Sequence, residues 1–477
     1  MTCGALIGGN WITEAETWFD VHDPATLHRI AKVPDFGVNA ATAAVDAAAA
    51  AFPTWKGIPP RERADMLLRM FQLMVRNIDQ LSKLISSENG KSLSDARAEV
   101  DYAAEFFRWY SEEAVRTSGT YGEAPAGGAR TIVTHHPIGV AALITPWNFP
   151  AAMTTRKIAP ALAAGCTVVL KPAAETPLTA LAIAELTIEA GIPNGVINVV
   201  PTANPAEVVG TWLDDQRVRL ISFTGSTNVG RLMLRQAAER VIVSSMELGG
   251  NAPFVICEDA DIPAAVEGAM TAKLRGGGQA CTAANRFYVH DDVADEFTEA
   301  IGARIEKLRV GAAADDCEIG PLISAEAAQT IESKIEEALR QGARITHQAA
   351  NVVGRAGYFV SPVVLRDVPP ESRLVVEETF GPVTPIVTWQ NEQNLLNQIN
   401  ASELGLAAYV YSRDLQRAIS IAESIEAGMV GINRGAISDP SAPFGGMKQS
   451  GLGREGARDG LKEFQETQYL SINWLGA

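Results

Sequence analysis

Apolar residues recur every three or four positions between residues 61 and 85, which is the period of an amphipathic helix. Gly90 ends this predicted helix, and a second helical pattern runs from about residue 94 to 115. The next stretch, about 118–137, has glycine-rich turns around a short β-prone run. This change of pattern indicates an excursion from the main domain.

From residue 139 onward, short apolar runs alternate with helix-like segments, which predicts parallel βαβ units. In the helix expected between the second and third runs, Thr176 is placed to cap the start, Pro177 to occupy the first position and Gly191 to follow the end. A second alternating block spans residues 251 to about 433, so two α/β domains with a cleft between them are the simplest interpretation. The first four apolar runs are 139–147, 167–172, 196–201 and 220–225.

Length and composition limit the classes of protein that remain. A chain of 477 residues is too long for one hydrophobic core, and 47% apolar with 20% charged residues is typical of a globular protein. The net charge of −16 argues against a general affinity for nucleic acid or anionic membranes, so local donors must hold any anionic ligand. The sequence has no signal-peptide pattern and no apolar run long enough to span a bilayer. We therefore expect a cytoplasmic protein with no membrane partner.

The cysteines and histidines do not form a metal-binding or disulfide pattern. The five cysteines are an odd number, widely spaced and without a CxxC pair. The one close histidine pair, His135 and His136, would point to opposite faces of a strand, so we expect no metal. Cys281 differs from the other four because three glycines precede it and small residues follow, in GGGQACTAANR (276–286). Its thiol is either a small buried group or the reactive atom of the protein.

A phosphate-binding turn is the second candidate feature. In FTGSTNVGR (223–231) a predicted strand runs into Gly225 and Ser226 and then into a helix, and helix N-termini bind anions. The glycine spacing does not match GxGxxG, and an ordinary strand-to-helix turn would have the same pattern.

Seven stretches together resemble the aldehyde dehydrogenase superfamily, in the order which that family shows and over essentially the whole chain. Residues 155–157, Arg275 and the KQSGLGREG ending make its succinate-semialdehyde dehydrogenases the most similar branch. The seven stretches are PWNFP (146–150), LKPAAETP (170–177), FTGSTNVG (223–230), ELGG (247–250), GQAC (278–281), EETFGP (377–382) and PFGGMKQSGLGREG (443–456).

The resemblance implies an α/β fold with three parts. A Rossmann-type dinucleotide-binding domain would comprise residues 1–117 and 138–249, and an α/β catalytic domain would comprise residues 250–449. A small β oligomerisation extension would be built from 118–137 and 450–477, and family members pair their subunits through such strands. The resemblance therefore implies a homodimer or a homotetramer.

The resemblance also assigns the catalytic groups. Cys281 would be the nucleophile, because a thiolate adduct divides a difficult aldehyde oxidation into two easier steps, a thiohemiacetal and then a thioester. The side-chain amide of Asn148 and the backbone N–H of Cys281 would stabilise the oxyanion, and Glu247 would activate the water that releases the acid. The other four cysteines are expected to be structural.

The expected cofactor is a nicotinamide dinucleotide. The resemblance places Lys171 on the adenosine ribose. Members that prefer NAD commonly have Glu three residues after this lysine, whereas this chain has Ala174 there and Glu175 one position later. Since Ala does not repel a 2′-phosphate, we favour NADP, although Glu175 could rotate back and restore a preference for NAD. The residues implied in cofactor binding are Trp147, Lys171, Ala174, Glu175, Gly225, Ser226, Leu248, Glu378 and Phe380.

For the substrate, the resemblance implies a four-carbon semialdehyde whose distal carboxylate is held by Arg156, Arg275 and Ser450, with Phe444 and Trp147 as walls of the tunnel. Each arginine could instead form an ordinary ion pair. The alternatives are an aliphatic, aromatic or betaine aldehyde, or a thioester-forming hydrolase that needs no dinucleotide. A noncatalytic relative would be expected to lack Cys281 or Glu247, and both are present.

Overall fold

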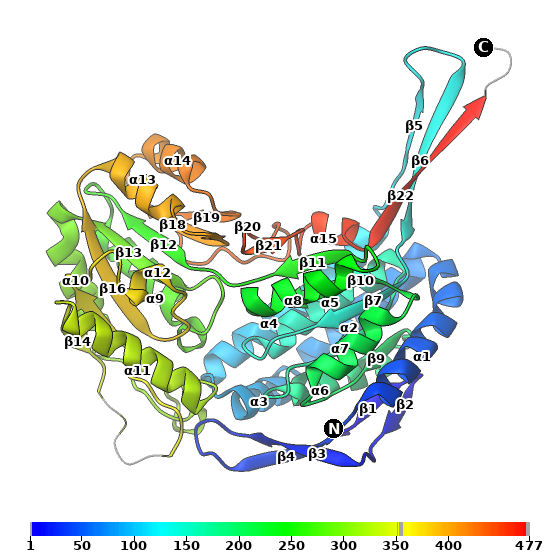
Figure 1. Cartoon of the computed structure of the whole chain (residues 1–477), viewed down its shortest axis with the longest axis horizontal. Coiled ribbons are helices and arrows are strands. Elements are labelled where there is room, and N and C mark those ends of the chain that lie inside the picture. The colour runs from blue at the N-terminus through cyan, green and yellow to red at the C-terminus, as the bar shows by residue number, and fades with distance from the viewer. Residues whose placement is uncertain (1, 351, 353–355, 474–477) are drawn as a thin grey trace.

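The computed structural model describes residues 2–350, 352 and 356–473. Two α/β bodies lie side by side, each built on its own sheet, and a three-stranded extension projects far from one of them (Figure 1). The predicted α/β class is confirmed. None of the helices in these ranges is both long and apolar enough to cross a membrane.

The first sheet has eight strands, and all four apolar runs predicted from residue 139 onward are among them. Its five central strands are parallel and follow the order of a dinucleotide-binding fold, in which the first strand of the unit, β7, lies between β8 and β10. In order across the sheet the strands are β2 (Asn10–Ile12), β1 (Ala5–Ile7), β9 (Ile197–Val199), β8 (Thr167–Lys171), β7 (Val140–Ile144), β10 (Val218–Thr224), β11 (Val243–Glu247) and β21 (Gly451–Leu452).

Helices cover both faces of this sheet, with one apolar core on each side. The five helices between residues 60 and 189 contribute to one core, and α1, α7 and α8 contribute to the other. The helices are α1 (Val38–Gly57), α2 (Pro60–Arg76), α3 (Ile78–Asn89), α4 (Leu93–Ala114), α5 (Pro150–Ala164), α6 (Pro177–Glu189), α7 (Pro205–Asp214) and α8 (Thr227–Ala238).

Two helix predictions need correction. The single helix expected over 61–85 is two helices, α2 and α3, which meet at Asn77. Thr176 does precede α6, but its hydroxyl donates to the Trp147 carbonyl (3.3 Å) and does not cap the helix. The cap comes from the buried carboxyl of Glu88 on α3, which accepts from the N–H groups of residues 178 and 179 at 2.8 and 2.9 Å. A partner 90 residues away in sequence leaves no local signal.

The second sheet has seven strands and forms the core of the other α/β body. Its strands are β14 (Arg344–Gln348), β15 (Val363–Arg366), β16 (Val383–Trp389), β13 (Ala284–His290), β12 (Ala252–Ile256), β18 (Ala407–Tyr411) and β19 (Met429–Ile432), in that order. Its helices are α9 (Ile262–Leu274), α10 (Asp291–Ile305), α11 (Ala325–Arg340), α12 (Arg373–Val376), α13 (Glu392–Asn400) and α14 (Leu415–Ser424).

The β extension consists of β5 (Thr120–Glu123), β6 (Ala129–Pro137) and β22 (Gln465–Asn473), with β6 in the centre. The C-terminal segment also supplies β21 to the first sheet and the short helix α15 (Asp459–Lys462), so it does more than build the extension. Residues 474–477 of that segment lie outside the described residues. The remaining strands form two antiparallel pairs, β3 (Thr17–His22) with β4 (Arg29–Asp35) and β17 (Leu404–Gly405) with β20 (Met447–Lys448).

Candidate active site

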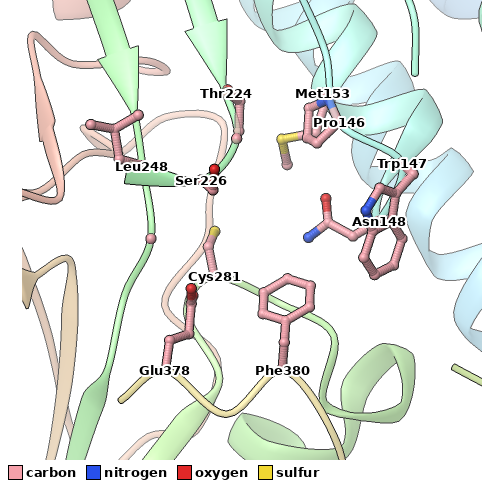
Figure 2. A pocket seen from close by; sticks show the side chains of 12 residues that line it. Pro146, Trp147, Asn148, Met153, Thr224, Ser226, Leu248, Cys281, Glu378 and Phe380 are labelled. Atoms are coloured by element: carbon pink, nitrogen blue, oxygen red, sulfur yellow. The ribbon is translucent and has the colours of Figure 1, made fainter. Parts of the chain in front are cut away.

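A cavity lies where the carboxyl ends of β7 and β10 in the first sheet meet the loop that precedes β13 in the second (Figure 2). This is the point where strand order reverses, the usual ligand position in such sheets. The structure brings eight of the predicted site residues to this cavity: Trp147, Asn148, Gly225, Ser226, Leu248, Cys281, Glu378 and Phe380. The same cavity is lined by Pro146, Met153, Thr224 and Gly249, which the sequence did not single out as site residues.

The three glycines before Cys281 allow its loop to take an unusual course. They form a short 3-10 turn, η1 (Arg275–Gly278), and have φ angles of 62°, 67° and 81°, a region that side chains other than glycine rarely adopt. A Cβ on Gly278 would lie 2.4 Å from the Gly381 carbonyl oxygen. The Gly276 N–H donates to Asp95 Oδ2 at 2.8 Å, which fixes the loop to α4. These contacts direct the Cys281 thiol into the cavity (Figure 2).

Asn148 faces Cys281 across the cavity (Figure 2). Its Nδ2 donates to the Gln279 carbonyl at 3.0 Å, which leaves the second proton of Nδ2 for another acceptor. Its backbone carbonyl accepts from Lys91 Nζ at 2.7 Å, and Lys91 forms a buried ion pair with Glu99 at 2.5 Å. Asn148 is therefore held on both its side chain and its backbone, as a preorganised oxyanion donor requires.

The charge state of the Cys281 thiol is set by its surroundings. Burial raises the pKa of the Cys281 thiol to about 12, the nearby Arg156 opposes this shift, and Glu247 adds to it. The thiol still lines the cavity, so a small reagent can reach it. In the free protein, Cys281 is therefore a neutral thiol at neutral pH.

We expect the rate of iodoacetamide alkylation of Cys281 in the free protein to keep rising up to about pH 10 without a plateau, because only the thiolate reacts. The extent of labelling would be measured by mass spectrometry of the peptide that contains residue 281. The Cys281→Ser variant is the control and should lose this labelled peptide. A plateau near neutral pH would contradict the expectation, because it would show that the thiolate is already formed.

Glu247 ends β11 and is almost fully buried, with 2% of its surface exposed. Burial raises the pKa of its carboxyl well above the usual range, and the neighbouring Glu455 raises it further. Neither carboxyl oxygen has a hydrogen-bond partner among the described residues. A Cβ on Gly445 would lie 2.9 Å from Oε1, so this carboxyl packs against a glycine that leaves it space.

Arg156, expected in the substrate clamp, lies in a buried charged cluster beside Glu247. Its Nε is 2.7 Å from Glu455 Oε2, and its guanidinium lies over the Phe444 ring, 4.0 Å from the centroid. Lys157 Nζ contacts the other Glu455 oxygen at 2.6 Å. Burial opposes the ionisation of Glu455, but Lys157 and Arg156 outweigh it and lower its pKa. Arg156 thus has an internal carboxylate partner in this structure.

The other two clamp residues occupy different places. Arg275 lines a second, smaller pocket, whereas Ser450 is fully buried, donates to the Gly249 carbonyl at 2.7 Å and accepts from the Gly405 N–H at 2.9 Å. The structure therefore does not bring Ser450 to either pocket. Ser438 also lines the pocket of Arg275, and it was not predicted from the sequence because it lies in a loop between two motifs. The same pocket is also lined by Thr282, Tyr409 and Ile437.

Three of the residues expected in cofactor binding, Lys171, Ala174 and Glu175, lie at or after the end of β8 and are not among those that line the cavity. Lys171 is buried at the end of that strand, and burial lowers its pKa to about 8 while Glu175 opposes the shift. Ala174 is half-buried and Glu175 is exposed. Ser226 caps α8, with its hydroxyl accepting from the Val229 N–H at 3.4 Å.

Glu378 and Phe380 approach the cavity from the second body (Figure 2). Glu378 Oε1 accepts from the Gly250 N–H at 3.0 Å, and the edge of the Phe380 ring meets Trp147 with 5.7 Å between centroids. A helix N-terminus, a lysine and this carboxylate form a donor and acceptor set that fits a dinucleotide. No group of three or more His, Cys, Asp or Glu side chains in the described part of the chain could hold a metal ion.

Comparison with known proteins identifies the family. The profile of the Aldehyde dehydrogenase family matches residues 11–470. A succinate-semialdehyde dehydrogenase of Paenarthrobacter nicotinovorans is 50% identical over 433 residues, which cover 91% of this chain and 96% of the relative. A glutarate-semialdehyde dehydrogenase of Pseudomonas putida KT2440 is 45% identical, over 98% of this chain and 97% of the relative.

A crystal structure described as an NADP-dependent enzyme of E. coli is similar over the whole fold. Its TM-score is 0.96 at 45% identity, and the match covers 99% of this chain and 98% of the other. The resemblance drawn from the seven sequence motifs is therefore confirmed. The chain belongs to the aldehyde dehydrogenase family and is an NAD(P)-dependent aldehyde-oxidising enzyme.

Proposed function

We propose that this enzyme oxidises succinate semialdehyde to succinate, with NADP preferred to NAD, through a thiohemiacetal and a thioester on Cys281. The observation that carries the proposal is the position of Cys281 in the cavity, opposite Asn148 and at the point where strand order reverses in the first sheet. The relative from Paenarthrobacter nicotinovorans supports the substrate.

In the proposed mechanism, the Cys281 thiol loses its proton to solvent in the cavity, its thiolate attacks the aldehyde carbon, and negative charge develops on the former carbonyl oxygen. The free proton of Asn148 Nδ2 and the N–H of Cys281 stabilise this charge, and such donors contribute about 3–4 kcal/mol each in comparable sites. A bound dinucleotide would supply the hydride acceptor for this adduct. The carboxylate of Glu247 then takes a proton from water, and the resulting hydroxide releases the acid from the thioester.

The residues that would hold the dinucleotide are Ser226 at the start of α8, Lys171 after β8, and Glu378 with Phe380 on the opposite wall. The preference for NADP rests on Ala174, which places no carboxylate where a 2′-phosphate would lie. Glu175 is exposed, and its negative charge raises the pKa of Lys171, so the two opposite charges partly compensate each other. The structural relative from E. coli supports the same preference.

The proposed recognition of the distal carboxylate uses Arg275 with Ser438 in the second pocket, and Ser438 takes the part first expected of Ser450. Arg156 contributes positive charge next to Cys281, although Glu455 neutralises part of it. Succinate and glutarate semialdehydes both carry a carboxylate beyond the aldehyde carbon. The alternative substrate is therefore the longer of the two, as the relative from Pseudomonas putida suggests.

We also propose that the β extension joins subunits into a homodimer or homotetramer. Within the described residues, each outer strand, β5 and β22, pairs only with β6 on one side, and these strands expose Tyr121 (65%), Tyr469 (59%) and Leu470 (41%). The proposal keeps the domain limits stated above. They are 1–117 with 138–249 for the dinucleotide-binding domain, 250–449 for the catalytic domain, and 118–137 with 450–477 for the oligomerisation segments. The cytoplasmic location also stays a prediction.

A steady-state panel tests the substrate and the cofactor together. Succinate semialdehyde, glutarate semialdehyde, butanal and benzaldehyde would each be tested with NAD and with NADP. We expect the highest kcat/KM for succinate semialdehyde with NADP. The Arg275→Ala variant should lower that value by about 100-fold while butanal changes little, because a charge-assisted contact is lost only for the anionic aldehyde.

An equal loss for butanal would refute the clamp. A higher kcat/KM for any other aldehyde would refute the proposed substrate, and a higher kcat/KM with NAD would refute the cofactor preference. Turnover of esters with no reduction of either dinucleotide would support the hydrolase alternative.

A further inference from the structure

Two buried lysines hold the backbone of the loop at residues 377–380, here called the Glu378 loop. Lys334 on α11 is 3% exposed, and its Nζ donates to the Glu378 carbonyl at 2.8 Å. Lys273 on α9 is 1% exposed, and its Nζ donates to the next carbonyl, that of Thr379, at 3.3 Å, and to Asn285 Oδ1 at 2.8 Å. Two ammonium groups from different helices therefore contact two successive carbonyls of one loop.

This loop forms the wall of the cavity opposite the first sheet. It presents the Glu378 carboxylate and the Phe380 ring to the cavity, next to Cys281 (Figure 2). Only the Gly250 N–H donates a hydrogen bond to the carboxylate within the described residues. The other carboxyl oxygen is thus available to accept a hydrogen bond from a ligand.

Stability alone does not explain the lysines. Removing an ammonium group from water costs several kcal/mol, which a neutral carbonyl offsets only in part. Lys334 has a carboxylate partner in Glu377, at 3.2 Å, but Lys273 has none within ion-pair distance in the described part of the chain. The charge of Glu378 favours the protonated form of Lys273, whereas burial and Lys334 oppose it.

Polar and charged groups from several elements packed around Glu378 act on its carboxyl. Burial raises the pKa of its carboxyl to about 7, and the Gly250 N–H, Lys334 and Lys273 oppose this rise in that order. The charge of Glu378 in turn raises the pKa of the Cys281 thiol. Burial and the charge of Lys334 lower the pKa of Lys273 to about 7. Within the loop, Glu377 pairs with both Lys334 and Arg373.

We propose that Lys273 and Lys334 are positioning residues, which hold the Glu378 loop in place and keep its carboxylate ionised, so that it accepts hydrogen bonds from the ribose on the nicotinamide side of the dinucleotide. This inference rests on the proposed function, since it assigns the dinucleotide to this cavity. A carboxylate accepts hydrogen bonds at both oxygens, whereas the protonated acid gives up part of that capacity. Loss of either ammonium therefore weakens binding of the nicotinamide half and leaves the adenosine half unchanged.

The test measures binding by isothermal titration calorimetry in a Cys281→Ala background, where no chemistry occurs. The probes are NADP and adenosine 2′,5′-bisphosphate, which contains only the adenosine half. We expect Lys334→Met to weaken NADP binding about 10-fold at pH 7, the value of one charge-assisted hydrogen bond, and to change adenosine 2′,5′-bisphosphate binding by less than about 2-fold. Lys273→Met provides a second variant with the same expectation.

The pH dependence separates positioning from a purely structural role. Without the ammonium group the pKa of Glu378 rises further, so its carboxyl is neutral at pH 7 and ionises again at higher pH. The difference in NADP affinity between Lys334→Met and its parent should therefore shrink by about pH 9. Lys334→Arg should restore most of the affinity. Glu377→Gln, which removes a carboxylate partner of Lys334 and Arg373 but neither buried ammonium group, should match the parent.

Three results would overturn the inference. They are unchanged NADP binding by both folded Met variants, a loss that is equal for the two probes, and a loss that does not vary with pH. Failure of the parent Cys281→Ala protein to bind any dinucleotide would instead overturn the proposed function. Thermal unfolding of each variant shows which proteins are folded.

Discussion

Replacement of Cys281 by serine is expected to abolish aldehyde oxidation, with a fall in kcat of roughly 10⁴-fold or more, since removal of a covalent nucleophile has effects of this size or larger in comparable enzymes. The physical reason is the availability of the anion. A serine hydroxyl ionises far less readily than a thiol, and burial raises the pKa of the neighbouring Glu247 carboxyl, which disfavours the ionised form that would act as a base. A serine at position 281 would therefore remain a neutral hydroxyl, which is a poor nucleophile. The measurement is the absorbance of the reduced dinucleotide, in both single and multiple turnovers.

The fold and the dinucleotide site should survive this substitution, because serine is close in size to cysteine. The matched control is Cys317→Ser, which changes a half-buried cysteine outside the cavity and should retain full activity. Calorimetry should show unchanged NADP binding by Cys281→Ser. Reduction of the dinucleotide at the unmodified rate would remove Cys281 from the mechanism and with it the proposed function.

The sequence predicted those features that depend on local pattern. Strands such as β7 and β10 are continuous apolar runs, and each is followed by residues that line the cavity. The position and the end of each strand could therefore be predicted from the sequence. The unusual loop before Cys281 also left a signal in the sequence, because its positive φ angles favour glycine at these positions. Ordered motifs therefore predicted the parts of the site that lie at strand ends and tight turns.

Features that depend on distant partners were not predictable in this way. Lys157 and Glu455 are 298 residues apart, yet their contact organises the charged cluster beside Glu247. Ser450 belongs to a recognised motif, but the fold uses its hydroxyl to link two backbone segments. Lys273 and Lys334 lie on helices with no motif, and their common target becomes visible only when both helices pack behind the Glu378 loop.

The second large effect is expected from Glu247→Gln, and it should fall on the release of the acid. Glutamine has the shape of the protonated carboxyl but cannot take a proton from water. We expect one equivalent of reduced dinucleotide per active site to form rapidly, followed by steady turnover that is slower by about 10²- to 10⁴-fold, the usual contribution of a general base. Rapid-mixing absorbance would measure the burst, and intact-protein mass would show an acyl group on Cys281. The exposed Glu239→Gln is the control and should turn over normally.

The direction in which steady turnover changes with pH follows from the raised pKa of Glu247. Glu247 acts as a base only when it is ionised, and burial together with Glu455 raises its pKa well above the usual range. Steady turnover of the unmodified enzyme should therefore rise with pH from neutrality into the alkaline range, as Glu247 loses its proton. In Glu247→Gln this rise should be absent until hydroxide itself attacks the thioester. A variant that shows no burst would mean that Glu247 acts before hydride transfer, as the base for Cys281, whereas unchanged steady turnover would exclude Glu247 as a base altogether.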